Sequence, residues 1–362
     1  MIIRKIIESI NLKANEHIDI KNMRQVIMIA PGLIEQWEVP SPGKPGPKEV
    51  LLKIERIGVC GSDIHVFHGE HPATSYPVVQ GHEYSATIEA VGEEVVKATP
   101  GMKVTARPQL VCGTCAPCRR GQYNACQKLM VQGFQSPGVA QDYFIVPEDR
   151  LILLPDTMTL EQGAMVEPAA VGAHSTNRTT GIKGKNVVVA GAGTIGNMVA
   201  QFAKAKGANK ILITDVSDYR LKKAEECGID HTLNVESTSF EEGSRSIFGE
   251  DGFQVGFEAA GVQNTMNYLM SNIEKGGDIV ILGVFSNNPT INMYFLGEHE
   301  LNVFGSMMYK HEDYEDAVEL IDTGKINIHP LISKHFPLES YYDAYKYIEA
   351  QGDKTMKVMI DL

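Results

Sequence analysis

The sequence contains no long apolar segment. Nowhere do about 18 apolar residues follow one another without a charge, which is the least that a membrane-spanning helix requires. The segment from Met1 to Lys13 is partly apolar, but Arg4, Lys5 and Glu8 interrupt it before the core of a signal peptide could form. We therefore expect no membrane span and predict a cytoplasmic protein.

Basic residues are also in short supply. The chain has 33 lysines and arginines against 45 aspartates and glutamates, which gives a formal net charge of -12 at pH 7. Nucleic acids and anionic membrane surfaces both require a basic face, so neither is expected as a partner. The charge favours a small, neutral molecule as the substrate.

Cysteines are few and unevenly placed. Four of the six form a C-x2-C-x2-C-x7-C array: Cys112, Cys115, Cys118 and Cys126. In a chain without a secretion signal, such crowding is more typical of metal ligation than of disulfides. One loop with this spacing can surround a tetrahedral zinc ion with four thiolates, which leaves no position for a substrate. We predict a structural zinc site here, and we expect Cys227 to be a small core residue.

The length indicates two domains, because 362 residues exceed the usual size of one hydrophobic core. Residues 1–22 are polar and weakly patterned, and we assign this leader no role. From residue 23 to about residue 155, short alternating segments are separated by Gly and Pro, which indicates a mostly β domain. Strands are expected over residues 25–29, 49–54, 86–91 and 102–106.

The pattern changes after Glu167. Apolar runs typical of buried strands follow at residues 186–190, 210–215, 254–258 and 278–282. A Gly-rich turn and a helical stretch separate the first two runs, and that order predicts a βαβ unit in a doubly wound, parallel α/β domain. Residues 314–321 are expected to be helical, and a last strand over residues 357–360 could return to the first domain.

A glycine fingerprint follows the first of these strands, Gly191-Ala192-Gly193-Thr194-Ile195-Gly196. Its glycines allow a tight turn and let backbone N–H groups approach a pyrophosphate at a helix N-terminus. Asp215 ends the next strand, where a carboxylate accepts hydrogen bonds from the ribose hydroxyls. That anion repels a 2′-phosphate, and Val216 and Ser217 supply no compensating Arg, so NAD is favoured over NADP. Arg220 completes the candidate cofactor-binding set, with Thr194 and Ile195.

A second constellation begins with Cys60-Gly61-Ser62-Asp63-Ile64-His65 and continues with His82, Glu83 and Glu167. Cysteine, histidine and a carboxylate would form a zinc site with an open position for water or substrate. Sequence separation shows no contact between them, however. The same residues are also expected if Cys60 is a buried core cysteine, His82 an ordinary polar histidine and Glu167 a helix-capping glutamate.

The motifs together resemble a known family. Cys60-Gly-Ser-Asp, Gly81-His82-Glu83, the four-cysteine lobe, Val166-Glu167-Pro168 and the glycine fingerprint occur in the order and spacing of the medium-chain, zinc-dependent alcohol dehydrogenase superfamily. The resemblance extends from about Met23 to the C-terminus. Val-Glu-Pro is similar to the sorbitol (polyol) and 2,3-butanediol dehydrogenase branch, whereas threonine dehydrogenases usually carry Asp-Pro there.

The resemblance implies a fold and a reaction. It implies a GroES-like catalytic domain over residues 23–169 and 308–362, with a structural zinc lobe at 108–130, and a Rossmann domain over 170–307. The catalytic zinc would lie in the cleft between the domains. The implied enzyme uses two zinc ions and NAD to oxidise a secondary alcohol, a polyol, sugar alcohol or related diol, to a ketone. A homodimer or homotetramer is expected, with residues 302–304 as a candidate sheet edge.

The family also implies roles for the zinc-site residues. Cys60 and His82 would bind zinc, and Glu83 is a third ligand in the polyol enzymes. Glu167 would either bind the ion or hold its water, and which carboxylate is bound stays open. Asp63 would accept a hydrogen bond from the free ring N–H of His82 and so fix its tautomer.

The proton would leave through the same short segment. Ser62 would take it from the substrate hydroxyl and pass it through the nicotinamide ribose toward His65. A surface histidine bonded only to water would give the same sequence.

The substrate pocket departs from the family. Animal sorbitol dehydrogenases carry Tyr and Arg where this chain has Val66 and Met308, so two polar contacts to a polyol are missing. Phe67, Met308 and Tyr309 would leave a less polar pocket, although Lys310 could contact an acid or a phosphate. An L-threonine-type amino-alcohol dehydrogenase and a sugar-phosphate or inositol-derivative dehydrogenase therefore remain alternatives.

Two readings from other classes are less well supported. A catalytically silent NAD-binding protein would have lost ligands at positions 60, 82 or 167, and all three are retained. A zinc-independent quinone reductase would lack the cysteine lobe and prefer NADPH, against both the four cysteines and Asp215.

Overall fold

The computed structural model describes residues 21–362, so the predicted leader lies almost wholly outside the described residues. Contacts divide the chain into two compact units. The first runs to Glu167 and resumes at Lys334–Ala350 and Lys357–Leu362, and the second comprises Pro168–Ser333 and Gln351–Met356. Within the described residues, no helix is long and apolar enough to cross a membrane.

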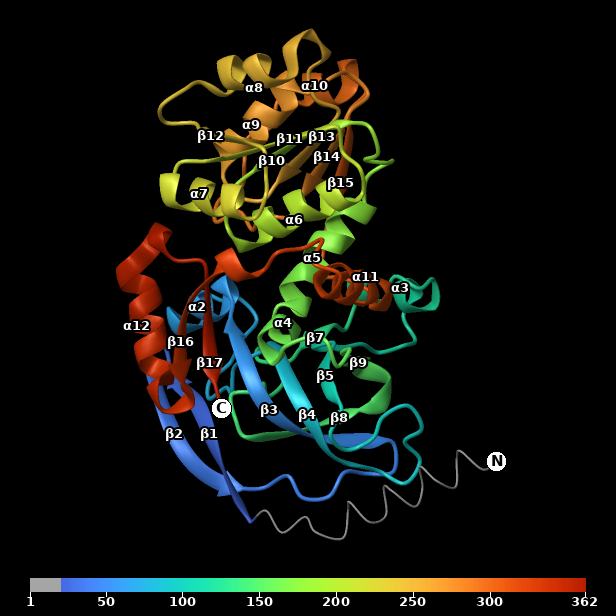
Figure 1. The fold of residues 1–362 in the computed structure, drawn as a ribbon, viewed down its shortest axis with the longest axis vertical. Coiled ribbons are helices and arrows are strands. Elements are labelled where there is room, and N and C mark those ends of the chain that lie inside the picture. Colours follow the sequence, from blue (N-terminus) through green and yellow to red (C-terminus); the bar gives the residue numbers. More distant parts are fainter. Residues whose placement is uncertain (1–20) are drawn as a thin grey trace. The chain divides into compact units, whose positions relative to one another are not determined.

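The first unit is built on a largely antiparallel sheet with the strand order β16-β17-β3-β4-β5-β9, and β8 also pairs with β3 (Figure 1). The bounds are β3 (Glu49–Val59), β4 (Glu83–Val91), β5 (Lys103–Ala106), β8 (Tyr143–Pro147), β9 (Leu151–Leu153), β16 (Ile332–Pro337) and β17 (Lys357–Asp361). Two smaller ribbons join β1 (Asn22–Ala30) to β2 (Leu33–Pro40) and β6 (Gln109–Leu110) to β7 (Met130–Val131).

Short helices complete this unit. They are α2 (Gly61–Phe67), α3 (Ala116–Arg119), α4 (Leu160–Ala164), α12 (Tyr341–Gln351), η1 (Tyr123–Ala125), η2 (Glu148–Arg150) and η5 (Leu338–Ser340). The apolar positions of β3 and β4 are buried together with Tyr341 and Tyr345 of α12, so this helix is part of the same core. The predicted last strand does return to the first unit, because β17 pairs with β3.

The second unit contains a parallel sheet in the order β12-β11-β10-β13-β14-β15. The bounds are β10 (Asn186–Ala190), β11 (Lys210–Asp215), β12 (His231–Asn234), β13 (Val255–Glu258), β14 (Asp278–Ile281) and β15 (Asn302–Gly305). The order reverses at β10, as in dinucleotide-binding sheets. The expected runs at residues 186–190, 210–215, 254–258 and 278–282 match four of these strands to within one residue.

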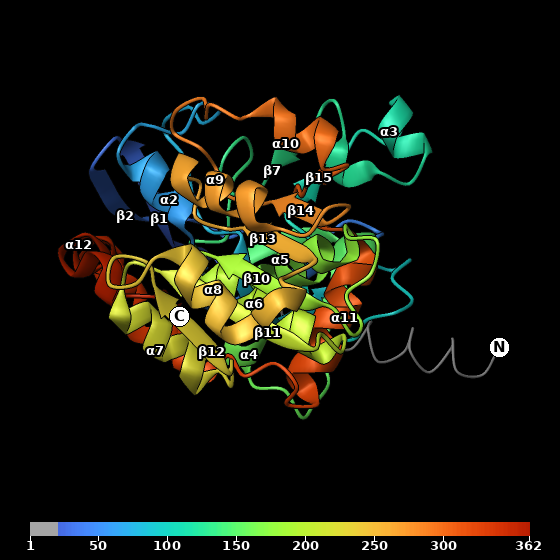
Figure 2. The same ribbon diagram turned by 90° about the horizontal axis from the view of Figure 1, so that it is seen from above.

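Helices cover both faces of the parallel sheet. The helices of the second unit are α6 (Thr194–Ala205), α7 (Asp218–Glu226), α8 (Phe240–Phe248), α9 (Gln263–Asn272), α10 (Met293–Glu298) and α11 (His311–Asp322), with η3 (Gly249–Asp251), η4 (His329–Leu331) and η6 (Gly352–Lys354). Residues of α6 and α7 form one apolar cluster with the strands, and residues of α8 and α9 form another. Figure 2, seen from above, shows α8 and α9 in front of these strands. The predicted doubly wound α/β domain is therefore confirmed.

The two compact units have boundaries close to those predicted at one end of the second domain and different at the other. Helix α5 (Val166–Asn177) begins where the first unit ends, close to the expected boundary at residue 169. Residues 308–333, expected in the catalytic domain, group by contacts with the second unit. The expected edge at residues 302–304 lies in β15, the last strand of its sheet, and the homo-oligomer stays a prediction.

Candidate metal centre and cofactor site

The first unit brings Cys60, His82 and Glu83 together. One ligand atom from each lies within 4.8 Å of the other two. Cys60 follows β3 directly and is the N-cap residue of α2, while His82 and Glu83 stand at the start of β4. Antiparallel pairing sets Gly58 opposite Glu83, so the end of β3 and the start of β4 meet at one point. Residues distant in sequence thereby form one cluster.

Gly58 makes room for this cluster. A Cβ atom at this position would lie 2.4 Å from Glu83 Oε2 and 3.3 Å from Lys357 Cδ. Carbon and oxygen cannot approach so closely, so a side chain here would displace the Glu83 carboxylate. The glycine is thus required by a close approach within the sheet.

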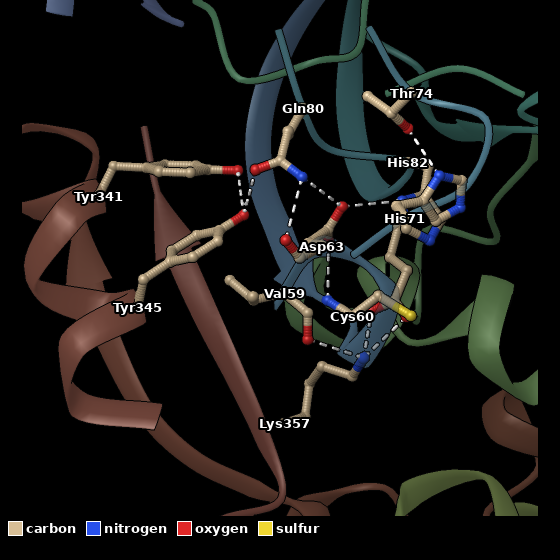
Figure 3. Close-up of polar contacts among 11 residues, drawn as sticks. Val59, Cys60, Asp63, His71, Thr74, Gln80, His82, Tyr341, Tyr345 and Lys357 are labelled. Carbon is tan, nitrogen blue, oxygen red and sulfur yellow. Dashed lines mark hydrogen bonds and ion pairs between the residues drawn. The ribbon is translucent and has the colours of Figure 1, made fainter. Parts of the chain in front are cut away.

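Asp63 lies beside the cluster, fully buried on the first turn of α2. Its Oδ2 accepts a hydrogen bond from Cys60 N at 2.9 Å, which caps the helix. Its Oδ1 lies 3.5 Å from His82 Nδ1, longer than an ordinary hydrogen bond. Gln80 Nε2 also donates to this carboxylate at 3.4 Å, and Tyr345 OH donates to Gln80 Oε1 at 2.9 Å (Figure 3). Asp63 therefore lies close to the His82 ring, and the hydrogen bond between them that the resemblance implies stays a prediction.

The charges around His82 change its affinity for protons. Burial lowers the pKa of His82, but the neighbouring Asp63 and Cys60 outweigh burial and raise the pKa well above its usual value. A zinc ligand must be a neutral imidazole, so a metal ion and a proton compete for this ring. Thiolate sulfur, imidazole nitrogen and carboxylate oxygen are together a donor set that zinc accepts. The residues present therefore fit a catalytic zinc ion.

Sequence reasoning missed the partner of Glu83. Lys357 Nζ, on β17, donates to Glu83 Oε1 at 2.7 Å and to Val59 O at 3.1 Å, and both charged groups are almost completely buried. Burial lowers the pKa of Lys357, but Glu83 and Cys60 oppose this and the pKa is raised, so the lysine stays charged. The one available signal was a lysine within an otherwise apolar last strand. Glu83, one of the three cluster residues, thus also forms a buried ion pair with Lys357.

Glu167 lies in the first turn of α5 and is 6% exposed. It is not one of the three residues whose ligand atoms share the 4.8 Å cluster. A carboxylate that lies outside this cluster can still hold a water molecule beside an ion, so its predicted role stays open.

The predicted proton-relay residues lie on α2. Ser62 is half-buried, whereas His65 is exposed and its Nδ1 lies 3.4 Å from Glu70 Oε2. Their spacing of three places both on one side of the helix. The relay itself stays a prediction.

The four lobe cysteines also converge. Their Sγ atoms lie within 4.8 Å of one another, with Cys115 to Cys118 at 3.3 Å and Cys126 to Cys112 at 3.5 Å. All four thiols are free. Backbone N–H groups of Thr114 and Cys115 lower the pKa of Cys112 to about 6, so this thiol is ionised at neutral pH. Four sulfur donors at these separations fit a tetrahedral zinc ion.

The glycine fingerprint forms the turn between β10 and α6. A Cβ at Gly196 would lie 1.8 Å from Gly191 O, so only glycine allows the helix to begin so close to the strand. Gly193, the N-cap of α6, has nothing within 4 Å of its Cβ position. The backbone there is open to a ligand, as an approaching pyrophosphate requires. Thr194 and Ile195 form the first turn of the helix.

Asp215 ends β11 next to this turn. Its carboxylate accepts hydrogen bonds from Ala192 N at 2.7 Å, Val216 N at 2.8 Å and Ser217 N at 2.9 Å. Arg220 lies on α7, and among the described residues its buried Nε has no hydrogen-bond partner. The predicted cofactor residues therefore gather at the carboxyl ends of β10 and β11, where Rossmann sheets bind dinucleotides.

The predicted pocket residues are less accessible than expected. Phe67 is 4% exposed, and its ring lies 5.3 Å from that of Tyr345 in the core of the first unit. Tyr309 is completely buried against Tyr314. Met308 has a φ of 50°, which a residue with a side chain rarely adopts. The role of all three in a pocket stays a prediction, and the packing of Phe67 and Tyr309 is that of core residues.

His71, in the loop between α2 and β4, was also missed by sequence reasoning. Its ring stacks on Phe134 with centroids 4.7 Å apart, and the ring of His82 lies 4.9 Å from the same phenyl group. Thr74 Oγ1 lies 2.7 Å from His71 Nδ1. Burial lowers the pKa of His71, so the ring is uncharged at neutral pH. Nothing in the sequence distinguishes this histidine from other loop histidines.

Comparisons with known proteins agree with this arrangement. Residues 46–156 match the alcohol dehydrogenase GroES-like domain, and residues 194–323 match the zinc-binding dehydrogenase family. Sorbitol dehydrogenase of Bacillus subtilis is 30% identical over 86% of this chain and 90% of its own length. L-threonine 3-dehydrogenase of Legionella pneumophila (strain Corby) is 32% identical over 89% and 94%. A solved zinc-binding dehydrogenase from Sinorhizobium meliloti, bound to NADP, superposes with a TM-score of 0.87 at 30% identity, covering 94% of this chain and 99% of that one.

The Glu83–Lys357 pair generates a stability prediction. Lys357→Met leaves a carboxylate buried without its counter-charge, and we expect the first unit to lose roughly 3–5 kcal/mol of stability in denaturant unfolding. The double variant Glu83→Gln/Lys357→Met removes both charges and should recover most of that loss. Lys354→Met, at an exposed lysine three residues earlier, is the matched control and should unfold as the wild type does. A Lys357→Met variant that unfolds at the wild-type midpoint would contradict the interpretation.

Proposed function

Because this chain belongs to the zinc-binding alcohol dehydrogenase family, in its sorbitol dehydrogenase-like branch, we propose that it oxidises a polyol, sugar alcohol or vicinal diol to a ketone. Its reaction class is that of a zinc-type, NAD-dependent alcohol dehydrogenase. The observation that carries the proposal is the convergence of Cys60, His82 and Glu83 on one buried cluster in the first unit. The Val-Glu-Pro motif at residues 166–168 supports a polyol or diol as the substrate, because this motif is typical of the sorbitol dehydrogenase-like branch.

Each group in the proposed reaction has a separate task. Zinc, when bound, supplies a Lewis acid that lowers the pKa of an alcohol, and the nicotinamide accepts the hydride. Cys60 and His82 hold the ion, Asp63 orients the His82 ring, and a carboxylate completes the ligand set. Lys357 is paired with Glu83, and Glu167, buried in the first turn of α5, is the second carboxylate that could hold the ion or its water.

The proton leaves along α2. Ser62 takes the proton of the substrate hydroxyl, and His65, exposed three residues later, releases it to water. The exposed position of His65 suits this last step, because its ring can exchange a proton directly with water.

A second candidate substrate is an amino-alcohol. L-threonine 3-dehydrogenase is as similar to this chain as the sorbitol enzymes are. The same metal and cofactor chemistry would act on its secondary alcohol, so the two candidates differ only in the groups that bind the rest of the substrate.

We expect a substrate panel to distinguish them. Zinc-loaded protein would be assayed for NADH formation with polyols, vicinal diols, inositols, sugar phosphates and L-threonine. Polyols or diols should give the highest kcat/KM. Glu167→Ala should lower kcat roughly hundredfold or more, because a buried carboxylate is lost from the site. Glu94→Ala, at an exposed glutamate, is the control. No turnover of any secondary alcohol would refute the proposal.

The proposed cofactor is NAD. The Asp215 carboxylate is held at the end of β11 by three backbone N–H groups, and a fixed anion there disfavours a 2′-phosphate. Arg220 argues the other way, since its buried Nε lacks a partner among the described residues and a guanidinium binds phosphate well. The similar structure from Sinorhizobium meliloti is bound to NADP, which also supports NADP as the alternative cofactor.

Asp215→Asn removes the charge and keeps an acceptor oxygen. We expect the ratio of kcat/KM with NAD to that with NADP to fall roughly tenfold or more, because the repulsion is lost. Asp230→Asn removes an exposed charge from the same unit and should leave the ratio unchanged. Wild-type protein that uses NADP as well as NAD would contradict the proposed preference.

Two zinc ions per chain are proposed, one at each cluster. Elemental analysis of desalted protein should give two zinc ions in the wild type and one in Cys118→Ser, because a four-thiolate site tolerates no missing ligand. Cys227→Ser changes a buried cysteine outside both clusters and should keep two. An unchanged zinc content in Cys118→Ser would show that the lobe does not bind the metal.

A further inference from the structure

We infer that His71 is the residue that recognises a second hydroxyl group of the substrate, through its Nε2 atom. This inference rests on the proposed function and names the group that selects a polyol over a simple alcohol. Val66 and Met308 stand where animal sorbitol dehydrogenases carry a Tyr and an Arg, so those two polar contacts to a polyol are missing here. The loop between α2 and β4 supplies a polar group from a different position.

The first step is that the His71 ring is fixed in place. Its face stacks on Phe134 at 4.7 Å with an interplanar angle of 24°. Thr74 Oγ1, three residues later in the same loop, lies 2.7 Å from Nδ1. An aromatic stack and a hydrogen bond together leave the ring little freedom to rotate, so the direction of Nε2 is set by the loop.

The second step is that the ring lies next to the metal cluster. Phe134 is 7% exposed and contacts both imidazoles, since the ring of His82 is 4.9 Å from the same phenyl centroid. Figure 3 shows the His71 ring beside that of His82, with Cys60 close by. Phe134 therefore forms a common apolar wall for a candidate zinc ligand and for His71.

The third step concerns the remaining nitrogen. Nδ1 is occupied by Thr74, and the side chain as a whole is half-buried, so Nε2 is the atom left to bind a ligand. The threonine hydroxyl can either donate to Nδ1 or accept from it. In a neutral imidazole the other nitrogen then has the complementary role, so Nε2 donates in the first case and accepts in the second. A hydroxyl group is the matching partner, because it can also do both. His71 would thus complement a neutral polyol.

The surroundings disfavour an anionic group at this position. Asp63 and Glu70 bring negative charge to the adjacent helix and loop, while Lys357 is already paired with Glu83. A phosphate or carboxylate on the substrate would meet these charges without a matching cation from this set. The choice of His71 as a hydroxyl-binding residue agrees with the net charge of the chain.

The test compares two substrates that share the reacting carbon. Zinc-loaded wild type and His71→Ala would be assayed with 2,3-butanediol and with 2-butanol, which lacks the second hydroxyl. His71→Ala should lower kcat/KM for the diol roughly tenfold to hundredfold, and change that for 2-butanol less than about threefold. His71→Gln, whose amide can also donate and accept, should recover part of the loss. His68→Ala, at an exposed histidine paired with Glu349, is the matched control.

Equal losses with both substrates, or an unchanged preference for the diol, would overturn the inference. Zinc content and thermal unfolding of each variant would separate a loss of fold from a loss of recognition. Calorimetric binding of a polyol to the complex with NADH provides a readout that does not need turnover. If the wild type oxidises no alcohol, the proposed function fails, and an unchanged polyol affinity in His71→Ala would still refute the role of His71.

Discussion

The metal cluster depends on the pairing of three strands that are far apart in the sequence. Antiparallel register sets Gly58 of β3 opposite Glu83 of β4 and Val59 opposite Val358 of β17. The missing side chain at position 58 creates the space in which the Glu83 carboxylate meets Lys357. The register therefore brings a thiol, an imidazole, a carboxylate and an ammonium group together, and the ring of Phe134 packs against both this imidazole and that of His71.

Much of this molecule could be predicted from local patterns. The four inner strands of the parallel sheet are mostly apolar and buried because both faces of the sheet are covered, and their limits could be predicted to within one residue. The glycine fingerprint and the four cysteines are equally visible, because the chemistry of a tight turn or a thiolate site needs those residues at fixed spacing. Cys60 and His82 were assigned by resemblance, since no spacing rule joins residues 22 positions apart.

The parts that escaped prediction depend on tertiary neighbours. Lys357 was seen only as part of a strand, because its partner Glu83 is reached through the pairing of β17 with β3. His71 is held near the metal cluster by stacking on Phe134, which lies in a separate segment after β7. Phe67 stays a predicted pocket residue, and its ring contact with Tyr345 of α12 could not be predicted from sequence order. In each case the decisive contact joins segments that sequence order keeps apart.

The discontinuity of the first unit has a consequence for biosynthesis. Glu83 is made early, whereas Lys357 follows only after the whole second unit has been translated. Domains fold largely as units while the ribosome elongates the chain. The main segment of the second unit, Pro168–Ser333, can therefore fold while the sheet beside the metal cluster still lacks β17. Until that strand is made, Glu83 lacks the counter-charge that Lys357 supplies in the complete sheet.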